Sequence, residues 1–265
     1  QQLTFNPQQW SGQKGLKKFL SLFYNQTSYT IDRRTRRDGE DFNINPFETD
    51  DNEIGAIINF SNSLFLNRGK QRYTTSYTYI NTNSKNLLST GLQENELYSH
   101  QMVFLHKVKE SWLINLKSSL GQTESEAENF PSRNFKIDNY TINPKVSYLF
   151  GKQSSISAFY AYTDKINQIG ALESLQQQNL GIAFALTKAE KLSLSGELKY
   201  IDNSFRGSAF TPVAYQMLEG LQPGTNFTWN VIAQKRLTKF LDLNVSYFGR
   251  KSENSKTIHT GNVQL

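Results

Sequence analysis

Hydrophobic and polar residues alternate along most of this 265-residue chain. In the segment KLSLSGELKY, residues 191–200, Leu192, Leu194, Leu198 and Tyr200 share one parity, and serine, glutamate and lysine occupy the other. Successive side chains of a β-strand point to opposite faces, so such a strand has one apolar and one polar face. The apolar face packs on a second sheet in a soluble protein, or contacts lipid in an outer-membrane barrel.

The alternation recurs in about twelve segments, and the gaps between them are alternately short and long. Short gaps include NRGK, KVKES, GKQS and TKAEK, whereas DRRTRRDGEDFNINPFETDDN is the first long one. Short turns at one end and long loops at the other are typical of an up-and-down antiparallel meander. We therefore predict an all-β fold, an up-and-down antiparallel transmembrane β-barrel of about twelve strands.

Most segments keep their apolar residues on one face. Examples are Ile58 and Phe60; Trp112, Ile114 and Leu116; Tyr140, Ile142, Val146 and Tyr148; Leu180, Ile182 and Phe184; and Leu241, Leu243 and Val245. Tyrosine and tryptophan near the segment ends favour a closed barrel with aromatic girdles, and closure removes the sheet edges that lipid could not satisfy. The alternative is a soluble sandwich or lipocalin-like barrel, in which the same alternation serves a packed core.

Composition favours the membrane interpretation. The hydrophobic fraction of 37% is low for a thick apolar core, yet aromatic residues make up 13% of the chain. This balance is expected when half of each strand faces lipid and half faces water. The chain has no cysteine, which excludes disulfides, cysteine nucleophiles and cysteine-based metal sites.

Charge sorts with the predicted ends of the barrel. The net charge is +6, and basic residues such as Arg68, Lys107 and Lys109 fall in or beside short turns. Acidic residues, including Glu124 and Glu126, cluster in the long loops. The basic excess is therefore a rim of turn residues and not one patch, so we expect no nucleic-acid partner.

The short turns, the long loops and the C-terminal run VAYQMLEGLQPGTNFTWNVIAQKRLTKFLDLNVSYFGRKSENSKTIHTGNVQL resemble the C-terminal barrels of Bacteroidota-type outer-membrane proteins. The resemblance implies a bacterial outer-membrane location, with short turns in the periplasm and long loops outside the cell. It also implies contact with the lipid bilayer and lipopolysaccharide, and it carries no catalytic residues. We divide the chain into a lead-in segment, residues 1–15, and an outer-membrane barrel, residues 16–265.

Three histidines are the only candidates for histidine-dependent catalysis. His100 and His106 share a parity on one strand but lie about 20 Å apart, so they cannot form one site. A barrel-wall hydrolase would need a serine or acidic partner for His100 or His259, and no motif marks one. Phosphate-binding loops, EF-hand loops and histidine-rich metal spacings are absent. We predict no enzyme activity, no cofactor and no metal.

The loop from Asp202 to Gly224 is unusually apolar for a surface loop. The sequence TPVAYQMLEG predicts a short helix with Thr211 as N-cap, Pro212 in the first turn and Gly220 at its end. This loop either covers the mouth of its own barrel or docks a partner subunit. The candidate residues for either role are Phe210, Tyr215, Met217, Leu218 and Leu221.

These features predict a non-enzymatic barrel that serves as the membrane-embedded subunit or anchor of a larger outer-membrane complex for assembly, secretion or transport. Protein subunits of that complex are the expected partners. The main alternative is a small, porin-like diffusion channel, although side chains and an infolded loop largely fill a barrel of this size. A barrel-wall hydrolase is the third hypothesis.

Overall fold

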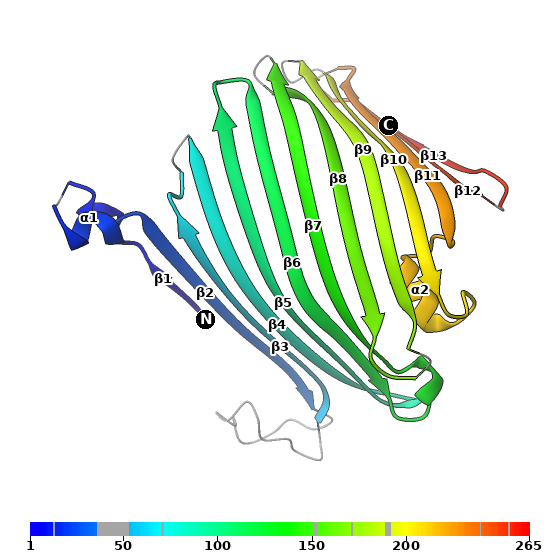
Figure 1. Cartoon of the computed structure of the whole chain (residues 1–265). Coiled ribbons are helices and arrows are strands. Elements are labelled where there is room, and N and C mark those ends of the chain that lie inside the picture. The colour runs from blue at the N-terminus through cyan, green and yellow to red at the C-terminus, as the bar shows by residue number, and fades with distance from the viewer. Residues whose placement is uncertain are drawn as a thin grey trace.

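The computed structural model describes residues 1–12, 14–35, 53–69, 72–150, 153–170, 172–188, 192–238, 240–253 and 255–265. Thirteen strands form one sheet, and each strand pairs with the next along the chain (Figure 1). Every pairing is antiparallel. The prediction of an all-β, up-and-down antiparallel fold is confirmed. Residues 36–52, within the first predicted long loop, lie outside the described residues.

The strands differ greatly in length, from four residues in β1 to eighteen in β5. In chain order the elements are β1 (Gln2–Phe5), η1 (Pro7–Trp10), α1 (Leu16–Leu20), β2 (Phe23–Thr35), β3 (Glu53–Leu66), β4 (Tyr73–Leu88), β5 (Gly91–Val108), β6 (Trp112–Ala127), η2 (Pro131–Arg133), β7 (Phe135–Phe150), β8 (Ser154–Asn167), β9 (Ser174–Lys188), β10 (Leu192–Arg206), α2 (Pro212–Leu218), β11 (Gly224–Arg236), β12 (Asp242–Ser252) and β13 (Ile258–Gln264). The short β1 lies within the predicted lead-in segment and accounts for the strand beyond the expected twelve.

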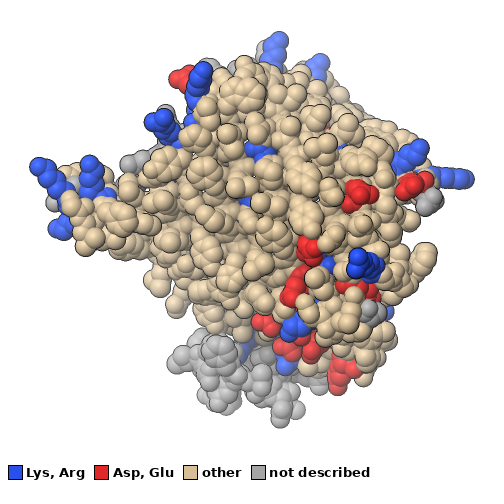
Figure 2. Space-filling view, in the orientation of Figure 1, with Lys and Arg blue, Asp and Glu red and all other residues tan. Residues whose placement is uncertain are grey.

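The two faces of the sheet differ in what they contact. Helix α2 packs against one face, which we call the inner face. The opposite, outer face carries a band of exposed apolar side chains, in which Leu120, Leu180 and Leu198 are 57%, 59% and 53% exposed. No second layer covers these side chains in the part of the chain that the structure describes (Figure 2). A soluble sandwich is thereby excluded, because its apolar faces would be buried.

The height of this apolar band matches a bilayer. On β6 the outward apolar positions run from Trp112 to Leu120, a stretch of nine residues. Membrane-spanning strands need about 9 to 11 residues. Strands β4 to β7 are 16 to 18 residues long, so they extend past the bilayer.

An acidic collar occupies the outer face beyond the apolar band, on the long-loop side. Its members are Glu94, Glu96, Glu124, Glu126, Asp138, Asp164 and Asp202. Figure 2 shows acidic residues gathered at the lower right and basic residues mainly along the upper edge and at the left. Within the collar, Lys136 donates a 2.7 Å hydrogen bond to Glu124, which raises the pKa of the lysine. The described residues thus sort by charge between the two ends, as predicted, but Glu124 and Glu126 lie on β6 and not in a long loop as expected.

The limit of the band on the long-loop side shifts from strand to strand. Leu120 on β6 pairs directly with Tyr140 on β7, and both belong to the band. The next partner of Tyr140 is Asp164 of the collar, so on β8 the band ends two residues earlier, at Tyr162. Such a shift is expected when strands are tilted against the bilayer plane, as they are in barrels.

The sheet is curved and has two edges. Strand β1 forms one edge and β13 forms the other, and these strands do not pair with each other within the described residues (Figure 1). We expected a closed barrel, whereas the described strands form an open arc of the up-and-down type. With thirteen strands of alternating direction, β1 and β13 run in the same direction. Pairing them to close the sheet would therefore need a parallel pair.

Glycines allow aromatic rings to lie flat across neighbouring strands. The Trp229 ring on β11 crosses Gly249 on β12, and a Cβ atom built there would lie only 2.1 Å from a ring atom. Phe159 covers Gly181 in the same way, with a corresponding distance of 2.2 Å. These close contacts fix the register of paired strands, since a larger residue would displace the ring.

We predict that Gly249→Ala destabilises the fold by about 1–3 kcal/mol, because the Trp229 ring must leave its position. The matched control is Gly261→Ala on β13, where the nearest atom to the added Cβ is 3.9 Å away. Urea-induced unfolding in detergent, followed by tryptophan fluorescence, measures both variants. Equal stability of the two variants would contradict the packing role of Gly249.

Candidate functional site

Helix α2 interrupts the long connection between β10 and β11. The Thr211 hydroxyl accepts a 3.0 Å hydrogen bond from the Ala214 backbone N–H, and Pro212 occupies the first helical position. The helix ends at Leu218, after which Glu219 and Gly220 have φ angles of 55° and 75°. The predicted N-cap and first turn are confirmed. Left-handed geometry begins at Glu219, one residue before the predicted Gly220.

One side of α2 packs against the inner face of the sheet at its long-loop end. The buried side chains of the helix are Val213, Ala214, Met217 and Leu218. They form a cluster with Ile137 of β7 and Leu175 of β9, and Phe135 and Phe205 flank it. This is the single apolar core cluster found among the described residues. In it the sheet packs against a loop segment and not against a second sheet.

A lysine on the inner face fixes the C-terminal end of α2. Lys165 of β8 donates to the Met217 carbonyl oxygen at 3.0 Å and to the Glu219 carboxylate at 2.7 Å. The Lys165 side chain is only 11% exposed. The positive charge of Lys165 also lies beside the partly negative C-terminal end of the helix, where a cation stabilises the helix dipole. Sequence analysis did not identify Lys165, since a lone lysine on a polar strand face gives no sign of its partner.

A buried polar network holds the chain between α2 and β11. Asn226 is fully buried and donates to the carbonyl oxygens of Gln222 and Gly224, at 2.8 and 2.9 Å. Asn203 donates to the same Gln222 carbonyl at 2.9 Å, and the Ser252 hydroxyl donates to the Asn226 side-chain oxygen. Every buried amide in this set has a partner, so the loop is held by directed bonds as well as by apolar packing.

The five residues proposed from the sequence divide into two groups. Met217 and Leu218 are 0% and 1% exposed and belong to the core under α2. Phe210 and Tyr215 are 97% and 70% exposed and face away from it. Leu221 is half-buried. The loop thus has a face that packs on its own sheet and a separate aromatic surface that remains accessible.

The histidines lie on the outer face, away from α2. The His100 Nδ1 atom hydrogen-bonds to the Tyr77 hydroxyl at 2.6 Å, and His259 Nδ1 bonds to the Tyr247 hydroxyl at 2.7 Å. No group of three or more histidine, aspartate or glutamate side chains suited to a metal occurs among the described residues. A tyrosine partner on a lipid-facing surface supplies neither the acid nor the serine of a hydrolytic site.

The exposed apolar band, bounded by a charged collar and formed by up-and-down strands, is the surface that outer-membrane barrels present to lipid. The described strands form a barrel-type, up-and-down antiparallel sheet with an exposed apolar band on its outer face. None of the described helices has the length and apolar character to span a membrane.

Comparisons with known proteins found similar solved structures, among them two bacterial proteins. The translocator domain of the autotransporter NalP from Neisseria meningitidis is 11% identical, with a TM-score of 0.34 and coverage of 79% of each chain. The ferric yersiniabactin uptake receptor FyuA from Yersinia pestis is 8% identical, with a TM-score of 0.48. That similarity covers 91% of this chain and 49% of the receptor. No protein-family model and no curated protein matches the sequence.

We predict that Met217→Ala and Leu218→Ala each destabilise the fold by about 2–5 kcal/mol, because each empties part of a closed core. The exposed residues supply matched controls: Phe210→Ala and Tyr215→Ala should change stability by less than about 0.5 kcal/mol. Urea-induced unfolding measures all four variants. A loss of stability for Met217→Ala or Leu218→Ala as small as that for Tyr215→Ala would show that α2 does not pack against the sheet.

Proposed function

We propose that this protein is the non-enzymatic, membrane-embedded part of a larger outer-membrane assembly. The observation that supports this role is the open sheet. Strands β1 and β13 are edge strands whose neighbours carry lipid-facing side chains. Lipid cannot satisfy the backbone N–H and C=O groups of an open edge.

Further β-strands therefore have to complete the sheet. Direct closure of β1 on β13 would be parallel, whereas each of the twelve pairings in the sheet is antiparallel. Additional strands, supplied by the rest of a larger protein or by a partner chain, can pair with both edges and keep every pairing antiparallel. This requirement favours a part of an assembly over a self-contained barrel.

The second observation is the position of α2 on the inner face at the long-loop end. Helix α2 occupies the inner face there, held by its core and by Lys165. An open diffusion channel would leave this face to water, so the position of α2 opposes the channel hypothesis. The accessible aromatic pair Phe210 and Tyr215 offers a contact surface to an assembly partner outside the membrane.

Site-specific photo-crosslinking in cell membranes tests the proposal. A photoreactive residue at Thr4 of β1 or Asn262 of β13 should crosslink to polypeptide outside residues 1–265. The matched control is Ser246 of β12, which pairs with Asn262 but lies one strand inside the edge. We expect no such product from Ser246, because its backbone neighbours are β11 and β13.

Mass spectrometry of the crosslinked peptides separates the outcomes. A product that joins β1 to β13 within one chain would contradict the proposal and establish a self-closed barrel. Equal crosslinking from Asn262 and Ser246 would contradict it as well, since the edge would then have no special neighbour.

A further inference from the structure

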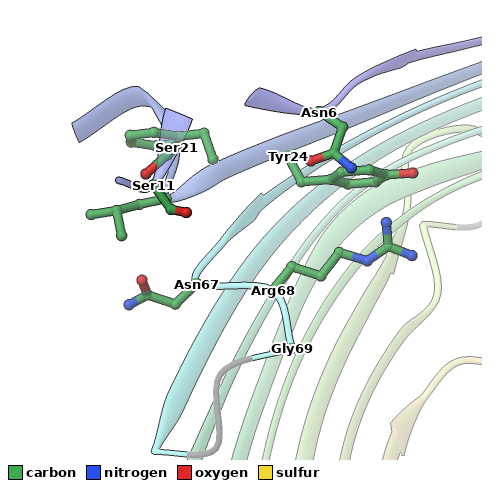
Figure 3. Close-up of a pocket in the computed structure, with 9 residues that line it drawn as sticks. Asn6, Ser11, Ser21, Tyr24, Asn67, Arg68 and Gly69 are labelled. Atoms are coloured by element: carbon green, nitrogen blue, oxygen red, sulfur yellow. The ribbon is translucent and has the colours of Figure 1, made fainter. Parts of the chain in front are cut away.

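A cavity of about 500 Å³ lies at the short-turn end of the sheet, between the N-terminal segment and the turn that follows β3. Its lining residues are Asn6, Ser11, Ser21, Leu22, Phe23, Tyr24, Asn67, Arg68 and Gly69. Figure 3 shows Arg68 reaching from this turn toward Tyr24 of β2, with Ser11 and Ser21 on the side away from its guanidinium. The cavity is far from α2, which lies at the opposite end of the strands (Figure 1).

The Arg68 guanidinium is held by stacking on aromatic rings. Its central carbon lies 3.8 Å from the centre of the Tyr24 ring and 5.3 Å from that of Phe65. Tyr24 and Phe65 are direct partners in the β2–β3 pairing, so the two rings form a platform. Stacking engages the faces of a guanidinium and leaves its N–H groups, which lie in the plane, available to an acceptor.

The turn that carries Arg68 is itself anchored. Asn67 is buried, and its backbone N–H donates to the Leu22 carbonyl oxygen at 2.8 Å. Asn67 and Gly69 have φ angles of 59° and 75°, a region that asparagine and glycine tolerate best. Arg68 therefore projects from a fixed backbone, which lowers the entropy lost when it binds a ligand.

The two chain segments that line the cavity contain no acidic residue. No aspartate or glutamate occurs before Asp32, and none occurs between Glu53 and Glu94, so both walls come from stretches without a carboxylate. None of the lining residues is acidic, and Lys17 and Lys18 on α1 add positive charge to the N-terminal segment. Among the described ion pairs, none involves Arg68.

We propose that this cavity binds an oxyanion, a phosphate or carboxylate group, through the Arg68 guanidinium. Arginine presents a planar fork of donors that matches two oxygens of such a group. Tyr24 and Phe65 lie on the inner face of the sheet, opposite the apolar band, which favours a small soluble anion as the source of the group. The headgroup of an anionic lipid at the membrane rim carries the same chemistry, and the experiment distinguishes the two sources.

Calorimetric titration of the detergent-solubilised protein with inorganic phosphate and with acetate tests the soluble source. Native mass spectrometry from bilayer discs that contain phosphatidylglycerol tests the lipid source, with phosphatidylcholine discs as reference. We expect Arg68→Gln to weaken binding at least about tenfold, since a charge-assisted hydrogen-bond pair is lost. Arg68→Lys should also weaken binding, because an ammonium keeps the charge but loses the fork.

The matched control is Arg133→Gln. Arg133 also lies over an aromatic ring, at 4.8 Å from the centre of Phe130, but at the long-loop end of the sheet. Arg133→Gln should bind like the unaltered protein, and circular dichroism should show that all variants fold. Binding in either the soluble or the lipid arm that is weakened by Arg68→Gln and not by Arg133→Gln supports the site and identifies its source. No binding in either arm, or equal binding by Arg68→Gln and Arg133→Gln, would overturn it.

Discussion

Backbone hydrogen bonding in lipid is the constraint on which the rest of this structure depends. A chain that places half of its side chains in hydrocarbon has to pair every N–H and C=O group internally, because no water is available to them. Each strand from β2 to β12 meets this demand through antiparallel pairing with both neighbours. Within the described residues β1 and β13 each pair on one side only, and the proposal of further strands is based on these two edges.

The inner face follows a different rule, because it adjoins water and not lipid. Polar side chains there bond to one another or to the backbone of the α2 connection, as Lys165 and Asn226 do. The apolar core under α2 is small, and it exists because a loop folds back against side chains such as Ile137 and Leu175. A helix of seven residues would not be stable alone, so its structure comes from this packing and from the cap at Thr211.

Sequence alone predicted the parts of the structure that depend on local pattern. Alternation predicted the strands and the outward position of residues such as Leu194 and Ile182, and turn length predicted the order of the sheet. The helix was predicted at Thr211 and Pro212, because capping depends on neighbouring residues.

Contacts between distant residues were not predictable in this way. The bond from Lys165 to Met217 joins positions 52 apart in sequence, and the placement of Arg68 on Tyr24 depends on a β-pairing register. Alternation also did not show that β1 and β13 stay unpaired with each other in the described part of the chain, since each strand satisfies the same pattern whether or not the first and last strands meet.

Contact between the outer face of this sheet and lipid can be measured in reconstituted bilayers. The measurement compares spin labels at Ile182, Leu194 and Leu243 with labels at Ser193 and Asn244. Oxygen dissolved in the hydrocarbon should relax the first group of labels strongly. A water-soluble paramagnetic reagent should relax the second group more strongly than the first. Equal oxygen accessibility in both groups would contradict a lipid-facing band, and with it the assignment of this sheet to the membrane.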